Sequence, residues 1–282
     1  MNETTPPPAP RDTASQPPQA IVLTKVNSLI PSVAYGPIAS RRLGNSLGVN
    51  LLPADLKICS FNCPYCECGW TNVGRSRRDL DSLPWPTPAR VEHEVREALQ
   101  RCLDQQFPIH YITMAGNGEP TMHPQFDEAV AAIRRVRDQL FPQAKVAVLS
   151  NAMHLDSEMV RRTLDTLDER MMKLDGGTEE MIKLIDHPLF PFEIERVVAN
   201  IASLRDCVVQ SMFVAGRFTN ATEAELEAWM AHIARIRPKY VQIYSIERRP
   251  PDATLQPVPK DRLREIAARL LDVTGIEGRV YG

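Results

Sequence analysis

Four cysteines lie within ten residues of the sequence, at Cys59, Cys63, Cys66 and Cys68. The first three have the spacing C-x3-C-x2-C on what the composition indicates is a short loop. Three thiolates on a tight loop can hold three irons of a cubane 4Fe–4S cluster. The fourth iron then has no cysteine and can take an outside ligand, and an open coordination position makes a metal centre reactive. The spacing therefore predicts a reactive iron–sulfur centre on Cys59, Cys63 and Cys66.

Two non-catalytic interpretations of this loop stay open. In the first, Cys68 is a fourth ligand and the loop binds zinc, although zinc sites usually combine two separate C-x2-C pairs and the chain has no second pair. In the second, the four cysteines hold an electron-transfer cluster. The remaining thiols, Cys102 on an apolar helical stripe and Cys207 before a strand, are expected to pack as small hydrophobic side chains.

Short apolar runs alternate with helical stripes along most of the chain. The predicted strands cover residues 48–52, 110–115, 145–149, 170–174, 208–214 and 240–246. Thr87-Pro88 predicts a helix start, and Thr222 with Glu225 has the spacing of a capping box. Strands that alternate with helices form parallel sheets. We therefore expect an α/β fold, a partial (β/α)6 TIM-like barrel with parallel strands, in one domain over residues 21–282.

Polar side chains follow the predicted strands, where active sites of such sheets lie. The second strand is followed by residues 116–120 (GNGEP), the third by Asn151 and the fourth by Asp175. Glycines let the backbone approach a ligand closely. An ordinary turn at 116–120 and a turn or capping role for Asp175 remain the structural alternatives. Lys173 faces either the barrel interior or solvent.

The composition is that of an ordinary globular protein, with 43% hydrophobic and 24% charged residues and a net charge of −2. No apolar run approaches the ~20 residues of a membrane span, and we expect a cytoplasmic protein with no membrane partner. The Pro-rich residues 1–20 are predicted to be a disordered tail. Basic clusters at Arg41-Arg42, Arg75–Arg78 and Arg248-Arg249 are either solvated faces or a surface for a phosphate-bearing substrate such as RNA.

The cysteine spacing, with the aromatic Tyr65 before the third cysteine, resembles the signature of the radical S-adenosylmethionine (SAM) superfamily. The resemblance implies that SAM chelates the open iron, and that one electron cleaves it to methionine and a 5′-deoxyadenosyl radical, which abstracts hydrogen from a substrate. It also implies a set of residues that contact SAM. Tyr65 would pack near the adenine and Asp175 would bind the ribose. The loop that binds the SAM amino group would be Asn117, Gly118 and Glu119, with Asn151 beside it.

A closer resemblance covers most of the chain from about Ser32 onward. Residues 35–48 (YGPIASRRLGNSLG), 61–66 (FNCPYC), 116–121 (GNGEPT) and 241–250 (VQIYSIERRP) are similar to bacterial Fe–S oxidoreductases grouped with wyosine tRNA synthase. That group implies tRNA or another nucleotide as a possible substrate. The superfamily implies an electron donor such as flavodoxin or ferredoxin. Since no cysteine precedes Cys59, we expect one cluster. Gln210 and Tyr244 either line the substrate space or pack in the core.

Overall fold

The structure is a computed structural model that describes residues 29–71, 80 and 82–282. The predicted tail at 1–20 and the basic cluster at Arg75–Arg78 lie outside the described residues. No helix of the described part of the chain is both long and apolar enough to cross a membrane.

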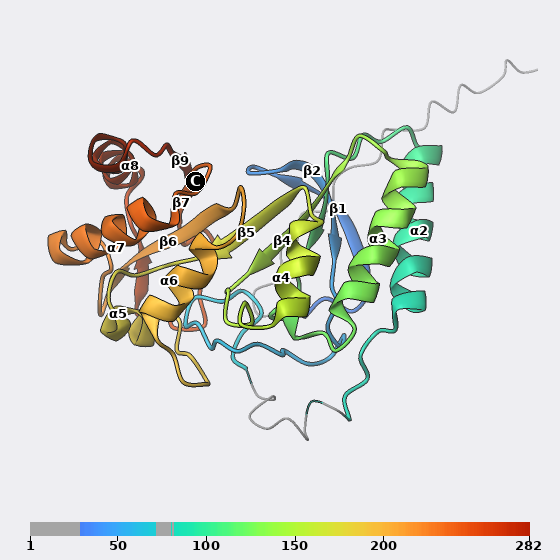
Figure 1. The fold of residues 1–282 in the computed structure, drawn as a ribbon, viewed down its shortest axis with the longest axis horizontal. Coiled ribbons are helices and arrows are strands. Elements are labelled where there is room, and N and C mark those ends of the chain that lie inside the picture. The colour runs from blue at the N-terminus through green and yellow to red at the C-terminus, as the bar shows by residue number, and fades with distance from the viewer. Residues whose placement is uncertain (1–28, 72–79, 81) are drawn as a thin grey trace, which may run out of the picture.

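Six neighbouring strands form a parallel sheet in chain order (Figure 1). They are β2 (Gly44–Val49), β3 (Tyr111–Met114), β4 (Lys145–Ser150), β5 (Glu169–Lys173), β6 (Val208–Gly216) and β7 (Val241–Ser245). The predicted partial barrel of parallel strands is confirmed. The first strand lies earlier than the predicted 48–52, because residues 44–49 pair with β3 and Leu51 is already in the loop that follows.

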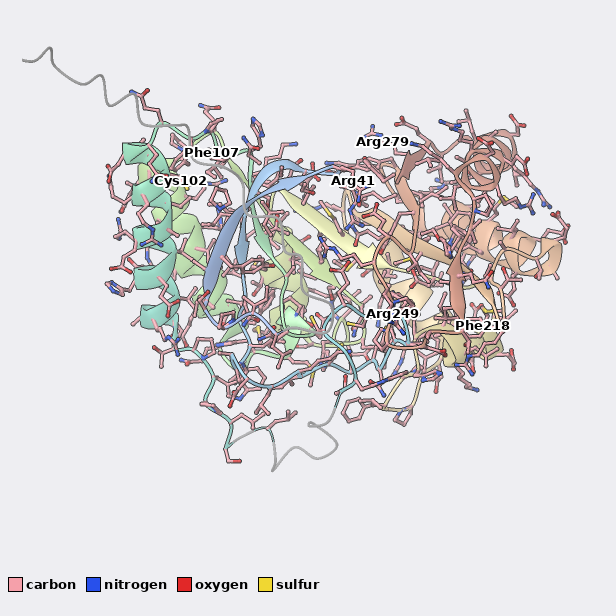
Figure 2. The ribbon with its side chains drawn as sticks, turned by 180° about the vertical axis from the view of Figure 1, so that it is seen from behind. Arg41, Cys102, Phe107, Phe218, Arg249 and Arg279 are labelled. Atoms are coloured by element: carbon pink, nitrogen blue, oxygen red, sulfur yellow. The ribbon has the colours of Figure 1, made fainter. Side chains whose placement is uncertain are left out.

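Three further strands were absent from the prediction. The strand β1 (Ala34–Ser40) pairs antiparallel with β2, β9 (Gly278–Tyr281) pairs parallel with β7, and the short β8 (Leu255–Pro257) pairs antiparallel with β6. Pro37 obscured β1, because proline lacks the N–H of a ladder bond and is tolerated at a sheet edge. The hairpin of β1 and β2 reaches toward the C-terminal half, with Arg41 at its tip (Figure 2).

Helices cover one face of the sheet (Figure 1). They are α2 (Pro88–Asp104), α3 (Phe126–Leu140), α4 (Glu158–Asp165), α5 (Glu179–Ile185), α6 (Ile194–Ala202), α7 (Glu223–Ile236) and α8 (Lys260–Thr274), and the short 3-10 helix η1 (Pro120–Met122) follows β3. The helix α2 begins as predicted, since the Thr87 side chain accepts from the Arg90 N–H at 3.2 Å. The apolar faces of these helices pack against the strands in one large core.

Of the two hydrogen bonds of the predicted capping box at α7, the one accepted by Thr222 is formed and the one accepted by Glu225 is replaced. The Thr222 hydroxyl accepts from the Glu225 N–H at 3.4 Å. The Glu225 carboxylate, however, accepts from the Thr178 hydroxyl at 2.5 Å and from the Gly177 N–H at 3.0 Å. Glu225 therefore fixes the loop after β5 rather than closing the box.

Cys102 and Cys207 are buried in the main hydrophobic core, as predicted. Figure 2 places Cys102 on α2, on the flank of the molecule.

Candidate active site

The cysteine loop crosses the C-terminal ends of the strands, along the lower edge in Figure 1. Its first anchor is the loop after β3. The Ile58 N–H donates to the Asn117 carbonyl at 2.9 Å, and the Glu119 N–H donates to the Ile58 carbonyl at 2.9 Å. Gly118 lies between these bonds with φ +138°, and a Cβ there would lie 1.8 Å from the Ile58 oxygen. Only glycine permits this close approach. The two loops that carry the predicted motifs are therefore in direct contact.

A second anchor holds the middle of the cysteine loop to the segment after α5. The Asn62 N–H donates to the Asp186 carbonyl at 3.0 Å, and the Leu189 N–H donates to the Ser60 carbonyl at 2.9 Å. Phe61 forms a bridge with Pro188 between these bonds. The cysteines are thus fixed between two segments that follow different strands.

The three predicted ligands differ in their surroundings. Cys63 is buried and its thiol donates to Asp186 Oδ1 at 3.4 Å. Cys59 Sγ accepts from the Phe61 N–H at 3.4 Å and from the Asn151 amide at 3.6 Å. A tight turn, with Cys66 N–H donating to the Cys63 carbonyl at 3.1 Å, brings the third thiol onto the same loop.

The protein disfavours thiolates at two of these positions. Burial, with the Glu119 charge, raises the pKa of Cys59 to about 12, and burial also raises the pKa of Cys63 well above its usual value. The pKa of Cys66 is lowered to about 6, chiefly because the Cys68 side chain donates to it. The Gly116 carbonyl, 3.2 Å from Cys68 Sγ, is the alternative acceptor for the single Cys68 thiol proton. Buried thiols ionise when metal ions coordinate them.

These residues fit an iron–sulfur cluster. Three thiols come from one rigid loop, two of them are strongly desolvated, and the buried cation Lys57 lies beside them. In a cluster each thiolate binds a different iron, so the sulfurs need not converge on one point. Among the described residues no group of three or more His, Cys, Asp or Glu side chains is arranged to hold a single metal ion.

Glu119 joins the ends of β3 and β4. One carboxylate oxygen accepts from the Thr121 hydroxyl at 2.6 Å and the Ser150 hydroxyl at 2.8 Å. The other accepts from the Asn151 N–H at 2.7 Å. The Asn151 amide in turn donates to the Ser60 hydroxyl at 2.8 Å. Glu119 and Asn151 are therefore brought to the cysteine loop, and their predicted contact with SAM stays a prediction.

Asn117 is completely buried, and its side chain serves the protein itself. Its Oδ1 accepts from the Ile30 N–H at 2.7 Å, while its Nδ2 donates to the Ile30 carbonyl and the Pro53 carbonyl, both at 2.9 Å. These bonds tie the segment before β1 to the loop after β2. This role was not predictable from local patterns, because both partners are remote in the chain.

A largely buried network of charged and polar side chains lies next to Cys63. The Lys173 ammonium forms ion pairs with Asp175 and, at 3.2 Å, with Asp186. The Tyr65 hydroxyl donates to Asp175 and lies 3.4 Å from Asp186 Oδ1. Lys173 is thus an interior residue, and the second predicted alternative, solvent, does not apply. Tyr65 and Asp175, predicted to contact adenine and ribose, are already hydrogen-bonded to each other, and their SAM contacts stay predictions.

The electrostatics of this network follow from burial and pairing. Burial alone would lower the pKa of Lys173, but the two aspartates outweigh it and hold that pKa well above its usual value. Burial raises the pKa of Asp186 to about 7 and also raises that of Asp175. One Asp186 oxygen, Oδ2, is buried without a partner among the described residues. Lys173 is therefore a fixed cation and a poor nucleophile.

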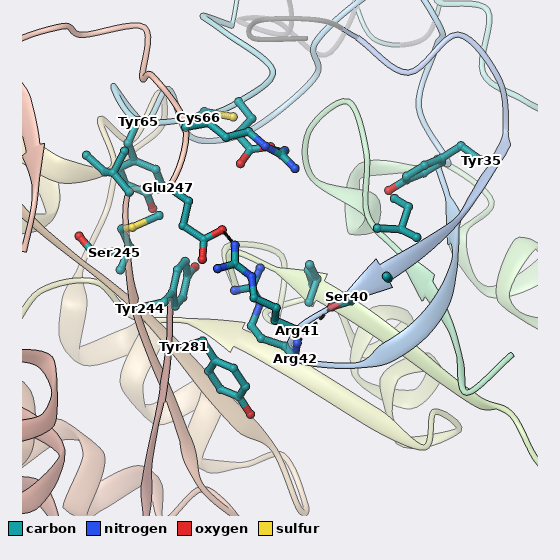
Figure 3. A pocket seen from close by; sticks show the side chains of 17 residues that line it. Tyr35, Ser40, Arg41, Arg42, Tyr65, Cys66, Tyr244, Ser245, Glu247 and Tyr281 are labelled. Carbon is teal, nitrogen blue, oxygen red and sulfur yellow. Dashed lines mark hydrogen bonds and ion pairs between the residues drawn. The ribbon is translucent and has the colours of Figure 1, made fainter. Parts of the chain in front are cut away.

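A cavity of about 490 Å³ begins at the cysteine loop and extends to the β1–β2 hairpin (Figure 3). Tyr65 and Cys66 line one end, and Tyr244 on β7 lines the wall. Of the predicted alternatives for Tyr244, the cavity wall is the observed one. Gln210 lines an adjoining pocket and donates to the buried Gln242 at 2.6 Å.

Three arginines from the predicted basic clusters line this cavity. Arg41 pairs with Glu247, as the dashed line in Figure 3 shows, and Arg248 pairs with Glu67. The Arg42 guanidinium lies 4.5 Å from the centre of the Tyr244 ring. Among the described residues Arg42 has no ion-pair partner, and its NH1 is buried without a hydrogen bond.

Residues 56–230 match the model of the Radical SAM superfamily. This match covers more than half of the chain and includes the cysteine loop, both anchors and the network around Lys173. The chain belongs to the radical SAM superfamily, whose members are enzymes that use SAM and an iron–sulfur centre.

Among curated proteins the chain is similar to a GTPase Obg of Brachyspira hyodysenteriae, at 29% identity over 76% of this chain and 30% of that protein. The chain thus spans less than a third of that relative. It is also 29% identical to UPF0026 protein slr1464 of Synechocystis, over 77% of this chain and 76% of the relative.

Two solved structures share the fold. A radical SAM methyltransferase from Sphaerobacter thermophilus has a TM-score of 0.62 at 15% identity, over 84% of this chain and 65% of that one. A TYW1 structure with a lysine–pyruvate adduct bound has a TM-score of 0.57 at 13% identity, over 80% of this chain and 73% of that one. The similarity to the wyosine group therefore extends to the fold.

Proposed function

We propose that this protein is a catalytic radical SAM enzyme with a single 4Fe–4S cluster on Cys59, Cys63 and Cys66. The observation that carries the proposal is the direct contact between the cysteine loop and the 116–119 loop through Ile58 and Gly118. A merely structural or electron-transfer cluster needs no second polar loop fixed beside it. When bound, the reduced cluster supplies the electron that cleaves SAM to methionine and a 5′-deoxyadenosyl radical, which abstracts hydrogen from the substrate.

The chain's own residues would hold and shield the reactants. Glu119 fixes the ends of β3 and β4, so that the backbone of the 116–119 loop presents its polar groups in one rigid position. The Tyr65 ring covers the cavity end of the cysteine loop, with Lys173 4.6 Å from its centre. These large side chains exclude water from the place where a radical would form.

The cavity supports a nucleotide or tRNA as substrate. Arg42 is a cation that lacks an acid among the described residues, and Arg41 and Arg248 flank it. Arginine binds phosphate bidentately and stacks on aromatic rings, as Arg42 does on Tyr244. Arg42→Met should weaken RNA binding and reduce the slope of log affinity against log salt by about 1. Arg264→Met on the outer helix α8 is the matched control, and equal effects of both variants would contradict a phosphate role for Arg42.

The electron would come from a small donor protein such as flavodoxin or ferredoxin, since the protein contains a single predicted cluster. Dithionite replaces this donor in the decisive assay. Protein reconstituted with iron and sulfide under anaerobic conditions is incubated with dithionite and SAM, and 5′-deoxyadenosine is measured. Wild type should form it, and Cys63→Ala should not.

Cys102→Ala is the control for this assay, because Cys102 is also a buried thiol but lies on α2 in the hydrophobic core. It should retain full 5′-deoxyadenosine formation. A wild-type protein that carries an iron–sulfur cluster but forms no 5′-deoxyadenosine would refute the proposal. The alternative of a non-catalytic iron–sulfur or zinc protein would then be preferred.

A further inference from the structure

Lys57 is a buried lysine two residues before the first cluster ligand. It is only 5% exposed, and its ammonium donates to the Gly69 carbonyl at 2.5 Å. Among the described residues no carboxylate oxygen lies within the 4.0 Å of an ion pair with it. An ammonium removed from water without an anionic partner is strongly disfavoured. An anion bound at the cysteine loop would therefore stabilise this ammonium.

The groups around Lys57 are the cluster ligands. Its ammonium is held at the Gly69 carbonyl, and the Gly69 N–H donates to the Cys66 carbonyl at 2.9 Å. The ammonium therefore lies against the turn that carries Cys66. Lys173, a partly buried lysine near the loop, is different, because Asp175 and Asp186 already neutralise it. Among the described residues Lys57 is thus a cation at the cysteine loop without a carboxylate partner.

An iron–sulfur cluster on three thiolates is itself an anion. With three thiolates on a doubly positive 4Fe–4S core the assembly has one net negative charge, and one-electron reduction gives it two. A fixed cation nearby stabilises the reduced form more than the oxidised form, and the charge near a cluster is one of the determinants of its potential. The gain is largest where water is excluded, because the effective dielectric constant is low there.

We propose that Lys57 is a positioning residue that compensates the charge of the cluster and raises its reduction potential, so that the electron for SAM cleavage can enter more readily. This inference rests on the proposed function only in requiring that a cluster binds. The competing explanation is structural, with Lys57 serving only to hold the Gly69 carbonyl and close the end of the loop.

The midpoint potential of the reconstituted cluster separates these explanations. It is measured by redox titration followed by electron paramagnetic resonance, in wild type, Lys57→Met and Lys57→Arg. Met keeps the length of the side chain without its charge, and Arg keeps the charge. Lys145→Met is the matched control, because Lys145 pairs with Glu169 at the start of β4. Iron content and the thermal stability of each apoprotein are measured alongside.

We expect a more negative potential for Lys57→Met and near wild-type values for Lys57→Arg and Lys145→Met. At the wild-type midpoint the ratio of reduced to oxidised cluster should fall about tenfold in Lys57→Met, which is about 59 mV for a one-electron couple. An unchanged potential in loaded Lys57→Met would overturn the inference and leave the proposed function standing.

Lys57 variants that fold but bind no iron also test the inference. If folded Lys57→Met binds no iron while Lys57→Arg binds a full complement, the positive charge is required and the inference holds. If both folded variants bind none, the shape of the side chain matters rather than its charge, and the inference is overturned. A wild type without any reducible cluster overturns the proposed function and this inference together.

Discussion

Replacing Gly118 by alanine should separate the cysteine loop from the loop after β3. The new Cβ would lie 1.8 Å from the Ile58 carbonyl oxygen, at a φ of +138° that disfavours any side chain. The backbone strain costs about 1–3 kcal/mol. Moving Ile58 also weakens its two backbone hydrogen bonds to residues 117 and 119, at about 0.5–1.5 kcal/mol each. We therefore expect Gly118→Ala to lower the free energy of unfolding by about 2–6 kcal/mol.

Gly275→Ala is the matched control for this prediction. Gly275 ends α8 with φ +71°, and a Cβ there would meet nothing within 4 Å. It therefore carries the conformational cost of about 1–2 kcal/mol without the clash. Urea unfolding of both apoproteins gives the two free energies, and iron content after reconstitution reports on the cluster. Only Gly118→Ala should lose iron. Equal destabilisation and equal iron in the two variants would refute the idea that contact at Gly118 positions the cysteines.

Three further predictions concern Cys68 in the cysteine loop, the Glu119 carboxylate and the pH dependence of stability. Cys68→Ala should retain iron and 5′-deoxyadenosine formation, because Cys68 donates to a backbone carbonyl, and loss of the cluster would favour a four-cysteine site instead. Glu119→Gln should lower the free energy of unfolding by about 2–3 kcal/mol in urea, since a charged acceptor is lost; no change would contradict this. Burial lowers the pKa of His123 below 6.5, so below that pH the unfolded chain binds a proton that the folded protein excludes. The free energy of unfolding should therefore fall as the pH falls below 6.5, and it should fall less in His123→Gln. Parallel curves of unfolding free energy against pH for the two proteins would contradict this.

The repeated elements of the fold were predictable because each has a local signature. A helical stripe or an apolar run is set by residues within one turn or one strand, and the six parallel strands followed from that pattern. The helix α5 was missed, since its seven residues, Glu179–Ile185, are too few for a clear stripe. The strand β9 was missed because its four residues are only partly buried and so show no apolar run.

The candidate site was only partly predictable from the sequence. The cysteine spacing and the loop after β3 were recognised as motifs, and their contact followed from parallel strands ending at one edge. Asp186 gave no signal, because it lies after a short helix and meets Cys63 through contacts more than 120 residues apart. Lys173 ends β5 and Asp175 lies two residues beyond the strand, so strand periodicity could not predict that they pair.

Lys57 and Lys173 show that the net charge near the cysteine loop depends on each lysine together with its carboxylate partners. Lys173 lies near Cys63, but Asp175 and Asp186 more than balance its charge. Lys57 lies near Cys59 and Cys66 with no carboxylate in ion-pair range among the described residues. Of these two lysines, Lys57 is thus the one that leaves positive charge for the thiolates and the group they bind. We therefore infer that the protein favours an added electron at the part of the loop that Lys57 contacts.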